Sequence, residues 1–135
     1  MISAVDSSVL LTLFKDEPQA SHCLDVLEQG ARAGELVICD VVVAEVGSLF
    51  ATFAEFERTL TPLGIRYDAI TDQAADLAGR MFQKYRADGG PREHLITDFL
   101  IGAHALKQAD RLVAFDRGYL RSYFKTLAVV VPGRL

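Results

Sequence analysis

Short hydrophobic segments alternate with longer amphipathic segments along this chain, and this alternation restricts the fold more than any other feature of the sequence. The short segments have the length and apolar composition of buried strands, whereas the longer ones repeat their apolar residues at helical spacing. Strands that are apolar throughout and are separated by helices favour an α/β fold with a mostly parallel sheet covered on both faces. The predicted strands are 2–5, 36–39, 65–70, 112–115 and 127–131.

Helices are predicted where apolar residues recur three and four positions apart. Thr71 begins one helix, and the segment 88–91, with two glycines and a proline, ends it. Asp40 is predicted to cap a single helix that runs on to Phe53, with Glu45 about one turn from its start. The predicted helical ranges are 7–17, 20–31, 41–53, 71–85 and 98–109.

The composition fits one compact domain. The chain has 135 residues, of which 50% are hydrophobic and 24% are charged, and its formal net charge is −4. This length allows one domain with a substantial core and is short for two. We therefore interpret residues 1–135 as a single domain.

The sequence gives no sign of export or of membrane insertion. The first apolar stretch has no basic residues before it and is interrupted by Asp6 and Lys15, and the longest later apolar run contains Glu45. Cys23 and Cys39 are not in a CxxC pair, and two buried, reduced thiols fit the cytosol. We expect a cytoplasmic protein that does not contact a membrane.

Acidic residues follow the predicted strands at the edge where ligands bind in open α/β sheets. Asp6 and Asp116 directly follow the first and fourth strands, at their carboxyl ends. Glu45 reaches the same edge if its helix leaves the second strand as predicted. Asp98 reaches it if its helix starts beside the last two strands. We therefore predict a site built from Asp6, Glu45, Asp98 and Asp116.

Four converging carboxylates repel one another unless protons are shared or cations intervene. Oxygen ligands are those that Mg²⁺ and Mn²⁺ prefer, and such an ion activates water and stabilises charge during phosphodiester hydrolysis. We predict Asp6 and Asp98 as metal ligands, with Glu45 and Asp116 binding a second ion or orienting the waters. Ser7 is predicted to bind a phosphate or a metal-bound water, and the products would carry a 5′-phosphate and a 3′-hydroxyl.

A structural role is the alternative for each acid taken singly, because an acid at a helix N-terminus is often only a cap or a dipole partner. We assign Asp40, Asp72 and Asp110 to caps or turns on this ground. The three histidines lack HxxxH or HxH spacing, so a zinc site is not expected.

Basic and aromatic residues near the predicted acids are candidates for RNA contacts. Arg92, Arg117 and Arg121 are predicted to bind the substrate, with Lys125 close by, through contacts to backbone phosphates. The aromatic residues of 119–124 would stack on unpaired bases or, alternatively, belong to the core. Such a local basic patch and a bound dication would also offset the mildly acidic net charge, which is unusual for a nucleic-acid binder.

Four segments resemble the acidic motifs of the PIN domain family, and the likeness covers nearly the whole chain. They are AVDSSVLLTLF around Asp6, VVVAEV around Glu45, ITDFLIGAHAL around Asp98 and VAFDRGYLRSYF around Asp116. Within the family the chain is most similar to the VapC-type toxins. The resemblance implies a three-layer fold and an endoribonuclease dependent on magnesium or manganese. It also implies a homodimer held inactive by a cognate antitoxin, whose tail enters the acidic groove.

Other functions remain open on the sequence. A PIN-like domain can bind RNA or proteins without cleaving, because fold does not fix function. A PIN nuclease can also act in RNA maturation rather than as a toxin. A receiver domain fits less well, because it needs a strand-end Asp in mid-chain and a Lys after a late strand, which this sequence lacks. A dehalogenase-like phosphatase also fits less well, because Ser8 stands where it needs a second Asp.

Overall fold

The computed structural model describes residues 1–91, 94–115 and 118–134 of the chain. Five strands form one parallel sheet in the order β3-β2-β1-β4-β5. The strands are β1 (Ile2–Val5), β2 (Glu35–Ile38), β3 (Ile65–Tyr67), β4 (Arg111–Val113) and β5 (Val129–Val130). The predicted mostly parallel sheet is therefore confirmed, although β3 and β5 are shorter than expected.

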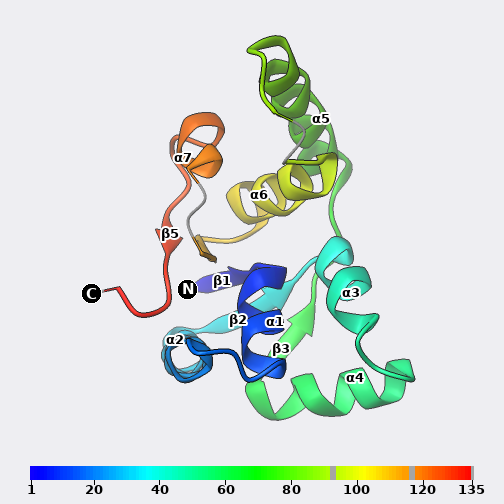
Figure 1. Cartoon of the computed structure of the whole chain (residues 1–135), viewed down its shortest axis with the longest axis vertical. Helices are drawn as coiled ribbons and strands as arrows, with labels where there is room; N and C mark the ends of the chain where they lie inside the picture. Colours follow the sequence, from blue (N-terminus) through cyan, green and yellow to red (C-terminus); the bar gives the residue numbers. More distant parts are fainter. Residues whose placement is uncertain (92–93, 116–117, 135) are drawn as a thin grey trace.

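The helices cover the sheet on both faces and give the molecule three layers, as expected. Figure 1 shows α5, α6 and α7 on one side of the sheet and α1, α2 and α4 on the other. Right-handed connections explain this arrangement, because the chain moves from β1 to β3 in one direction and then crosses back to β4 and β5. The helices are α1 (Ser7–Phe14), α2 (Ala20–Ala33), α3 (Asp40–Gly47), α4 (Phe53–Leu60), the 3₁₀ helix η1 (Thr61–Leu63), α5 (Asp72–Ala87), α6 (Ile96–Gln108) and α7 (Tyr119–Tyr123).

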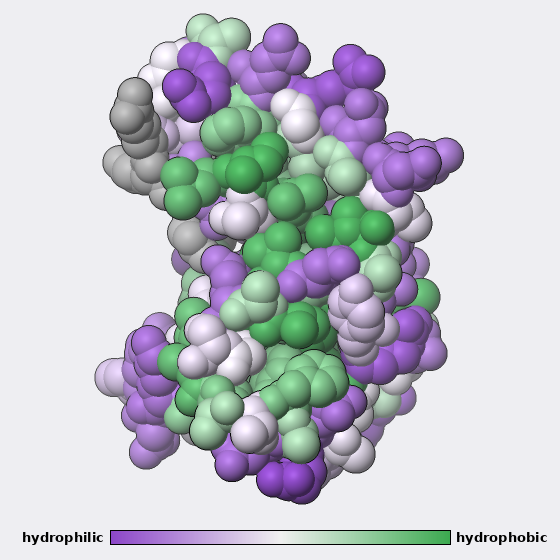
Figure 2. Space-filling view, turned by 90° about the vertical axis from the view of Figure 1, so that its right-hand side faces the viewer, coloured by the Kyte–Doolittle hydropathy of each residue, from purple (hydrophilic) through white to green (hydrophobic). Residues whose placement is uncertain are grey.

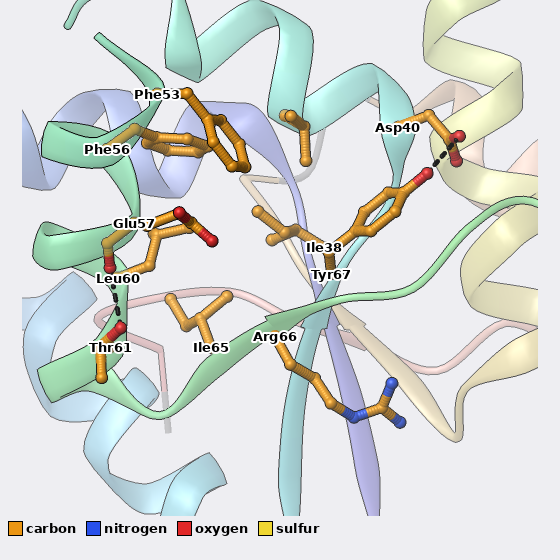
Figure 3. Close-up of a pocket in the computed structure, with 11 residues that line it drawn as sticks. Ile38, Asp40, Phe53, Phe56, Glu57, Leu60, Thr61, Ile65, Arg66 and Tyr67 are labelled. Atoms are coloured by element: carbon orange, nitrogen blue, oxygen red, sulfur yellow. Dashed lines mark hydrogen bonds between the residues drawn. The ribbon is translucent and has the colours of Figure 1, made fainter.

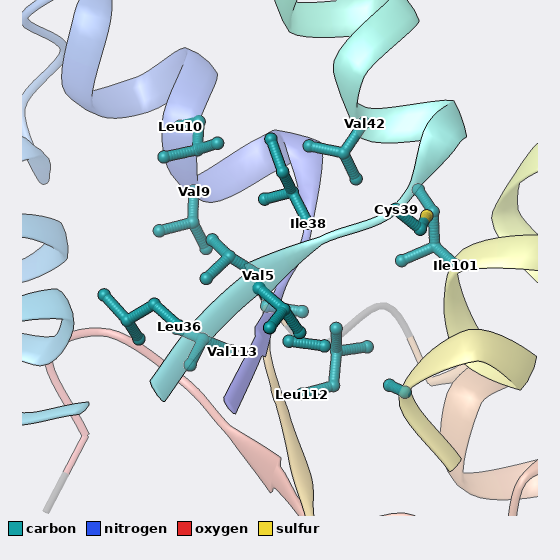
Figure 4. Packing of buried hydrophobic residues seen from close by; sticks show 14 of the residues in the cluster. Val5, Val9, Leu10, Leu36, Ile38, Cys39, Val42, Ile101, Leu112 and Val113 are labelled. Carbon is teal, nitrogen blue, oxygen red and sulfur yellow. The ribbon is translucent and has the colours of Figure 1, made fainter. Parts of the chain in front are cut away.

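The core consists of apolar side chains between the sheet and each helical layer. In Figure 4, Val9 of α1 and Ile101 of α6 lie on opposite sides of the strands, which explains why the strands are apolar throughout. Gly102 lets α6 approach the C-terminal segment closely, since a Cβ there would lie 2.7 Å from the Phe124 ring. The buried thiols of Cys23 and Cys39 are free, as predicted.

The prediction of one helix from 41 to 53 is wrong. α3 ends at Gly47, and α4 begins at Phe53 after a separate N-cap at Thr52, whose Oγ1 accepts a hydrogen bond from the Glu55 backbone N–H at 3.2 Å. Phe50 lies in the connection, where its ring packs against Phe14 and Phe56. The apolar residues around 50–53 thus have helical spacing but belong to separate elements.

Two of the acids that the sequence assigned to caps or turns, Asp40 and Asp110, bond groups on other elements. Asp40 does not cap α3, since Cys39 holds the N-cap position; the Asp40 carboxylate accepts hydrogen bonds from Tyr67 and Ile70 instead. Asp110 lies before β4 and accepts a hydrogen bond from the Ile2 backbone N–H at 2.6 Å. Both acids tie neighbouring connections to the sheet.

In the part of the chain that the structure describes, no helix combines the length and the hydrophobicity that crossing a membrane requires. Some apolar side chains are nevertheless exposed. The face that carries α3, α4 and α5 shows hydrophobic surface in both its upper and lower parts (Figure 2). The large exposed hydrophobic residues are Met1, Leu49, Phe53, Tyr67, Leu95 and Ile96.

Candidate active site

Asp6 occupies the point where β1 passes into α1. Its backbone N–H donates to the Val113 carbonyl oxygen at 2.9 Å, which continues the pairing of β1 with β4. Its carboxylate caps α1, accepting hydrogen bonds from the Ser8 backbone N–H at 3.2 Å and from the Ser8 hydroxyl. The residue is only 5% exposed. A carboxylate is therefore fixed at the positive end of a helix, between two central strands.

The strand order makes this location the topological switch point of the sheet. From β1 the chain proceeds to β2 and β3 on one side, whereas β4 and β5 lie on the other. In open α/β sheets, ligands bind in the crevice at the carboxyl ends of the strands that flank such a point. Asp6 directly follows β1 there, and β4 ends three residues before Asp116. Asp116 itself lies outside the described residues, as do Arg92 and Arg117.

Glu45 is connected to this location through Ser7. The Ser7 hydroxyl donates a hydrogen bond of 2.6 Å to Oε1 of Glu45, and the Ser7 side chain is buried. Because Ser7 directly follows Asp6, this bond joins the helix that carries Glu45 to the residue beside the first acid. The sequence assigned Ser7 to a phosphate or a metal-bound water; in the structure its hydroxyl orients Glu45.

Asp98 lies in the first turn of α6. Its Oδ2 accepts a hydrogen bond from the Leu95 backbone N–H at 3.0 Å and lies 3.8 Å from Nδ1 of His94. α6 packs against both β1 and α3, the two elements that carry or lead to Asp6 and Glu45. The helix that holds Asp98 therefore contacts the elements that hold the other two described acids.

A second group of polar side chains stands at the carboxyl ends of β2 and β3, and the sequence did not predict it. Asp68 Oδ2 lies 2.8 Å from Nε2 of the buried His104 and accepts a hydrogen bond from Gln108 at 3.1 Å. Burial raises the pKa of Asp40, but the hydrogen bonds from Ile70 and Tyr67 outweigh it and leave that pKa below its ordinary value. These bonds fix the connection between β3 and α5.

A hydrophobic cavity of about 430 Å³ lies beside this group, between α3, α4 and β3. Figure 3 shows Phe53, Phe56 and Leu60 on one side of it and Tyr67, bonded to Asp40, on the other. Asp6, Glu45 and Asp98, the three predicted acids that the structure describes, do not line the cavity. It is therefore separate from the switch point.

Of the basic residues predicted to bind a substrate, the structure describes Arg121. It lies on α7 with an exposed side chain and, with Lys125, lines a cavity of about 350 Å³ that Leu127 and Val129 also border. Two positively charged side chains beside a cavity can bind phosphate oxygens.

The described residues at the switch point carry carboxylate oxygens, which are suitable ligands for a hard divalent cation. Within residues 1–91, 94–115 and 118–134, no three His, Cys, Asp or Glu side chains group closely enough to hold an ion. Mg²⁺ does not require such a cage, because it usually takes one or two protein carboxylates and completes its shell with water and phosphate. The buried carboxylate of Asp6, with carboxylates on the helices packed beside it, meets that requirement.

Comparison with known proteins places the chain in a family. The profile of the PIN domain matches residues 4–125. An arginine–tRNA ligase of Thermobifida fusca is 25% identical over 112 residues, which are 83% of this chain and 19% of the ligase. The chain thus spans about a fifth of the length of that curated relative.

Three solved structures have the same fold over nearly their whole length. FitAcB from Neisseria gonorrhoeae is 20% identical with a TM-score of 0.68 and covers 100% of both chains. A toxin–antitoxin complex from Klebsiella pneumoniae is 20% identical with a TM-score of 0.63, over 98% of this chain and 99% of that one. VapC20 of Mycobacterium tuberculosis, a toxin that cleaves the sarcin-ricin loop, is 15% identical with a TM-score of 0.61, over 93% and 98%.

Proposed function

Because this chain belongs to the PIN domain family, we propose that it is an endoribonuclease that hydrolyses RNA with the help of Mg²⁺ or Mn²⁺ and acts as the toxin of a toxin–antitoxin pair. The observation that carries this proposal is the arrangement at the switch point, where the buried Asp6 is joined to Glu45 through Ser7. The structural relatives described as a toxin–antitoxin complex and as an RNA-cleaving toxin support it.

The four acids have distinct roles in the proposed reaction. Asp6 and Asp98 bind the metal, which supplies charge neutralisation at the scissile phosphate and makes water more acidic. Ser7 holds one oxygen of Glu45, so that the other oxygen can accept a hydrogen bond from the attacking water. Asp116, which follows β4 in the sequence, is the fourth acid of the proposed set. Cleavage leaves a 5′-phosphate and a 3′-hydroxyl.

The partners follow from the same proposal. A cognate antitoxin inhibits the enzyme by inserting a segment into the acidic groove, and two copies of the chain form a homodimer. The protein acts in the cytoplasm, where its RNA substrate is found. Arg92, Arg117 and Arg121 contact phosphates next to the scissile bond.

Metal-dependent cleavage tests the function directly. Purified protein is expected to cut a mixed pool of single-stranded RNA in Mn²⁺ or Mg²⁺ and to stop when excess EDTA is added, because the carboxylates alone cannot neutralise the phosphate. Sequencing of the products would show 5′-phosphate ends. If folded protein leaves the pool intact at every metal concentration, the nuclease assignment is wrong and a binding role takes its place.

Arg121, on α7, is expected to contribute to RNA binding through its charge alone. Arg121→Ala should weaken RNA binding at low salt by about threefold to tenfold and lower the slope of log affinity against log salt by about 0.7, the value for one contact to single-stranded RNA. Binding should be measured with EDTA present so that cleavage does not interfere. Arg58→Ala, on α4, is the matched control. Equal salt slopes for Arg121→Ala and the native protein would remove Arg121 from the RNA-binding surface.

A further inference from the structure

The connection between α5 and α6 determines where Asp98 lies. α5 ends at Ala87 and α6 begins at Ile96, so that a short connection ends within the turn that carries the acid. The last described residues of this connection, His94 and Leu95, both contact the Asp98 carboxylate. A shift of the connection would therefore move Asp98 relative to Asp6.

Tyr85, in the last turns of α5, contacts this connection at two points. Its side chain is only 5% exposed, and its hydroxyl donates a hydrogen bond of 2.5 Å to the Pro91 carbonyl oxygen. Its ring meets the edge of the His94 ring, with 5.7 Å between the ring centroids. Tyr85 thus contacts the connection on both sides of the segment 92–93.

The backbone of the connection lies directly against the Tyr85 ring. A Cβ on Gly90 would come within 2.5 Å of that ring, so only a glycine allows this approach. Gly89 has a φ of +79°, a conformation that glycine adopts without strain. The two glycines that mark this break in the sequence therefore bring the chain close to one tyrosine.

A second tyrosine holds the other end of the connection. The hydroxyl of Tyr123, in α7, donates to Oδ2 of Asp88 at 2.9 Å, and its ring packs at a steep angle against the rings of Tyr85 and Phe99. Burial and, to a smaller extent, the hydrogen bond to the Asp88 carboxylate raise the pKa of Tyr123, so the hydroxyl remains a donor at neutral pH. α7 begins three residues after Asp116. The segment that follows the fourth acid is therefore tied to the segment that precedes Asp98.

We propose that Tyr85 is a positioning residue for Asp98, holding the connection between α5 and α6 against α7 through its hydrogen bond to Pro91 and its contact with His94. This inference rests on the proposed function for its catalytic meaning. The structural part of the inference, the position of the Asp98 carboxylate, does not depend on that function. Tyr123 assists from α7, through Asp88.

Tyr85→Phe tests the proposal because it removes the hydroxyl and keeps the ring. Amide hydrogen exchange at Leu95, whose N–H donates to Asp98, is expected to become about tenfold faster, the factor that corresponds to loss of one hydrogen bond. RNA cleavage should show kcat lowered by a similar factor with KM changed less than about twofold, because the phosphate contacts remain. Tyr123→Phe should change both quantities in the same direction by a smaller factor.

Tyr67→Phe is the matched control. It also removes a tyrosine hydroxyl that donates a hydrogen bond, in this case to Asp40, but Tyr67 lies on β3 beside the separate hydrophobic cavity. It should leave Leu95 exchange and kcat unchanged. Unchanged Leu95 exchange in Tyr85→Phe, with native thermal stability, would overturn the proposal whatever the cleavage rate. If the native protein does not cleave RNA, the proposed function fails, and the exchange rate still decides whether Tyr85 positions Asp98.

Discussion

Asp6→Asn is expected to lower kcat for RNA cleavage by about 100-fold or more, because it removes the charge that we propose to bind the metal ion. The fold should survive, since Asn caps a helix as well as Asp does and can still accept the hydrogen bonds from Ser8. The loss of activity would therefore come from the missing charge and not from unfolding. Raising the Mn²⁺ concentration should restore part of the activity if binding of the ion is the step that is impaired.

The measurement is a single-turnover cleavage assay across a range of Mn²⁺ concentrations, together with a thermal melt of each protein. Asp40→Asn is the matched control, because Asp40 also follows a strand at the carboxyl edge but bonds Tyr67 and Ile70. Its activity should remain within about threefold of native, as for a substitution outside the reacting groups. Native-like cleavage by Asp6→Asn would rule out Asp6 as a ligand.

Phe99→Ala is expected to destabilise the protein by about 3–5 kcal/mol, the usual cost of emptying a fully buried phenylalanine site. Phe99 is 0% exposed, and its ring packs against those of Phe82, Tyr85, Tyr123 and Phe124. These rings come from α5, α6 and the C-terminal segment. The substitution would therefore leave a cavity where α5, α6 and α7 pack against one another.

Urea denaturation followed by circular dichroism gives the free energy of unfolding for this comparison. Phe53→Ala is the control, because Phe53 is 62% exposed and should change the stability by less than about 1 kcal/mol. A loss of under about 1 kcal/mol for Phe99→Ala would mean that the aromatic cluster does not hold α5, α6 and α7 together.

The strands and most helices were predictable because each has its own local signal. β1, β2 and β4 are short apolar runs, and the start of α5 was found from Thr71, which does cap it. The break between α3 and α4 was missed because the apolar residues on either side keep helical spacing. Thr52 with Glu55 three positions later is a capping pattern that would have revealed the second helix.

The elements that carry or precede Asp6, Glu45 and Asp98 were predictable from the sequence, whereas the contacts of these residues were not. Asp6 was placed correctly at the end of β1, because a parallel sheet fixes the direction of every strand. The hydrogen bond from Ser7 to Glu45 joins residues 38 positions apart, and no local pattern encodes it. The polar group at Asp68 and His104 depends in the same way on how α6 crosses the sheet.

Among the described strands the central one, β1, comes first along the chain, whereas its neighbour β4 comes fourth. Arg111 Nε donates to the Ser3 hydroxyl across 108 residues, and the two strands pair along their length. A nascent chain therefore carries Asp6 long before β4 and the segment behind it exist. Translation that stops between these strands releases a fragment in which β1 lacks one of its two neighbours, so the Val113 carbonyl that pairs with the Asp6 backbone N–H is missing.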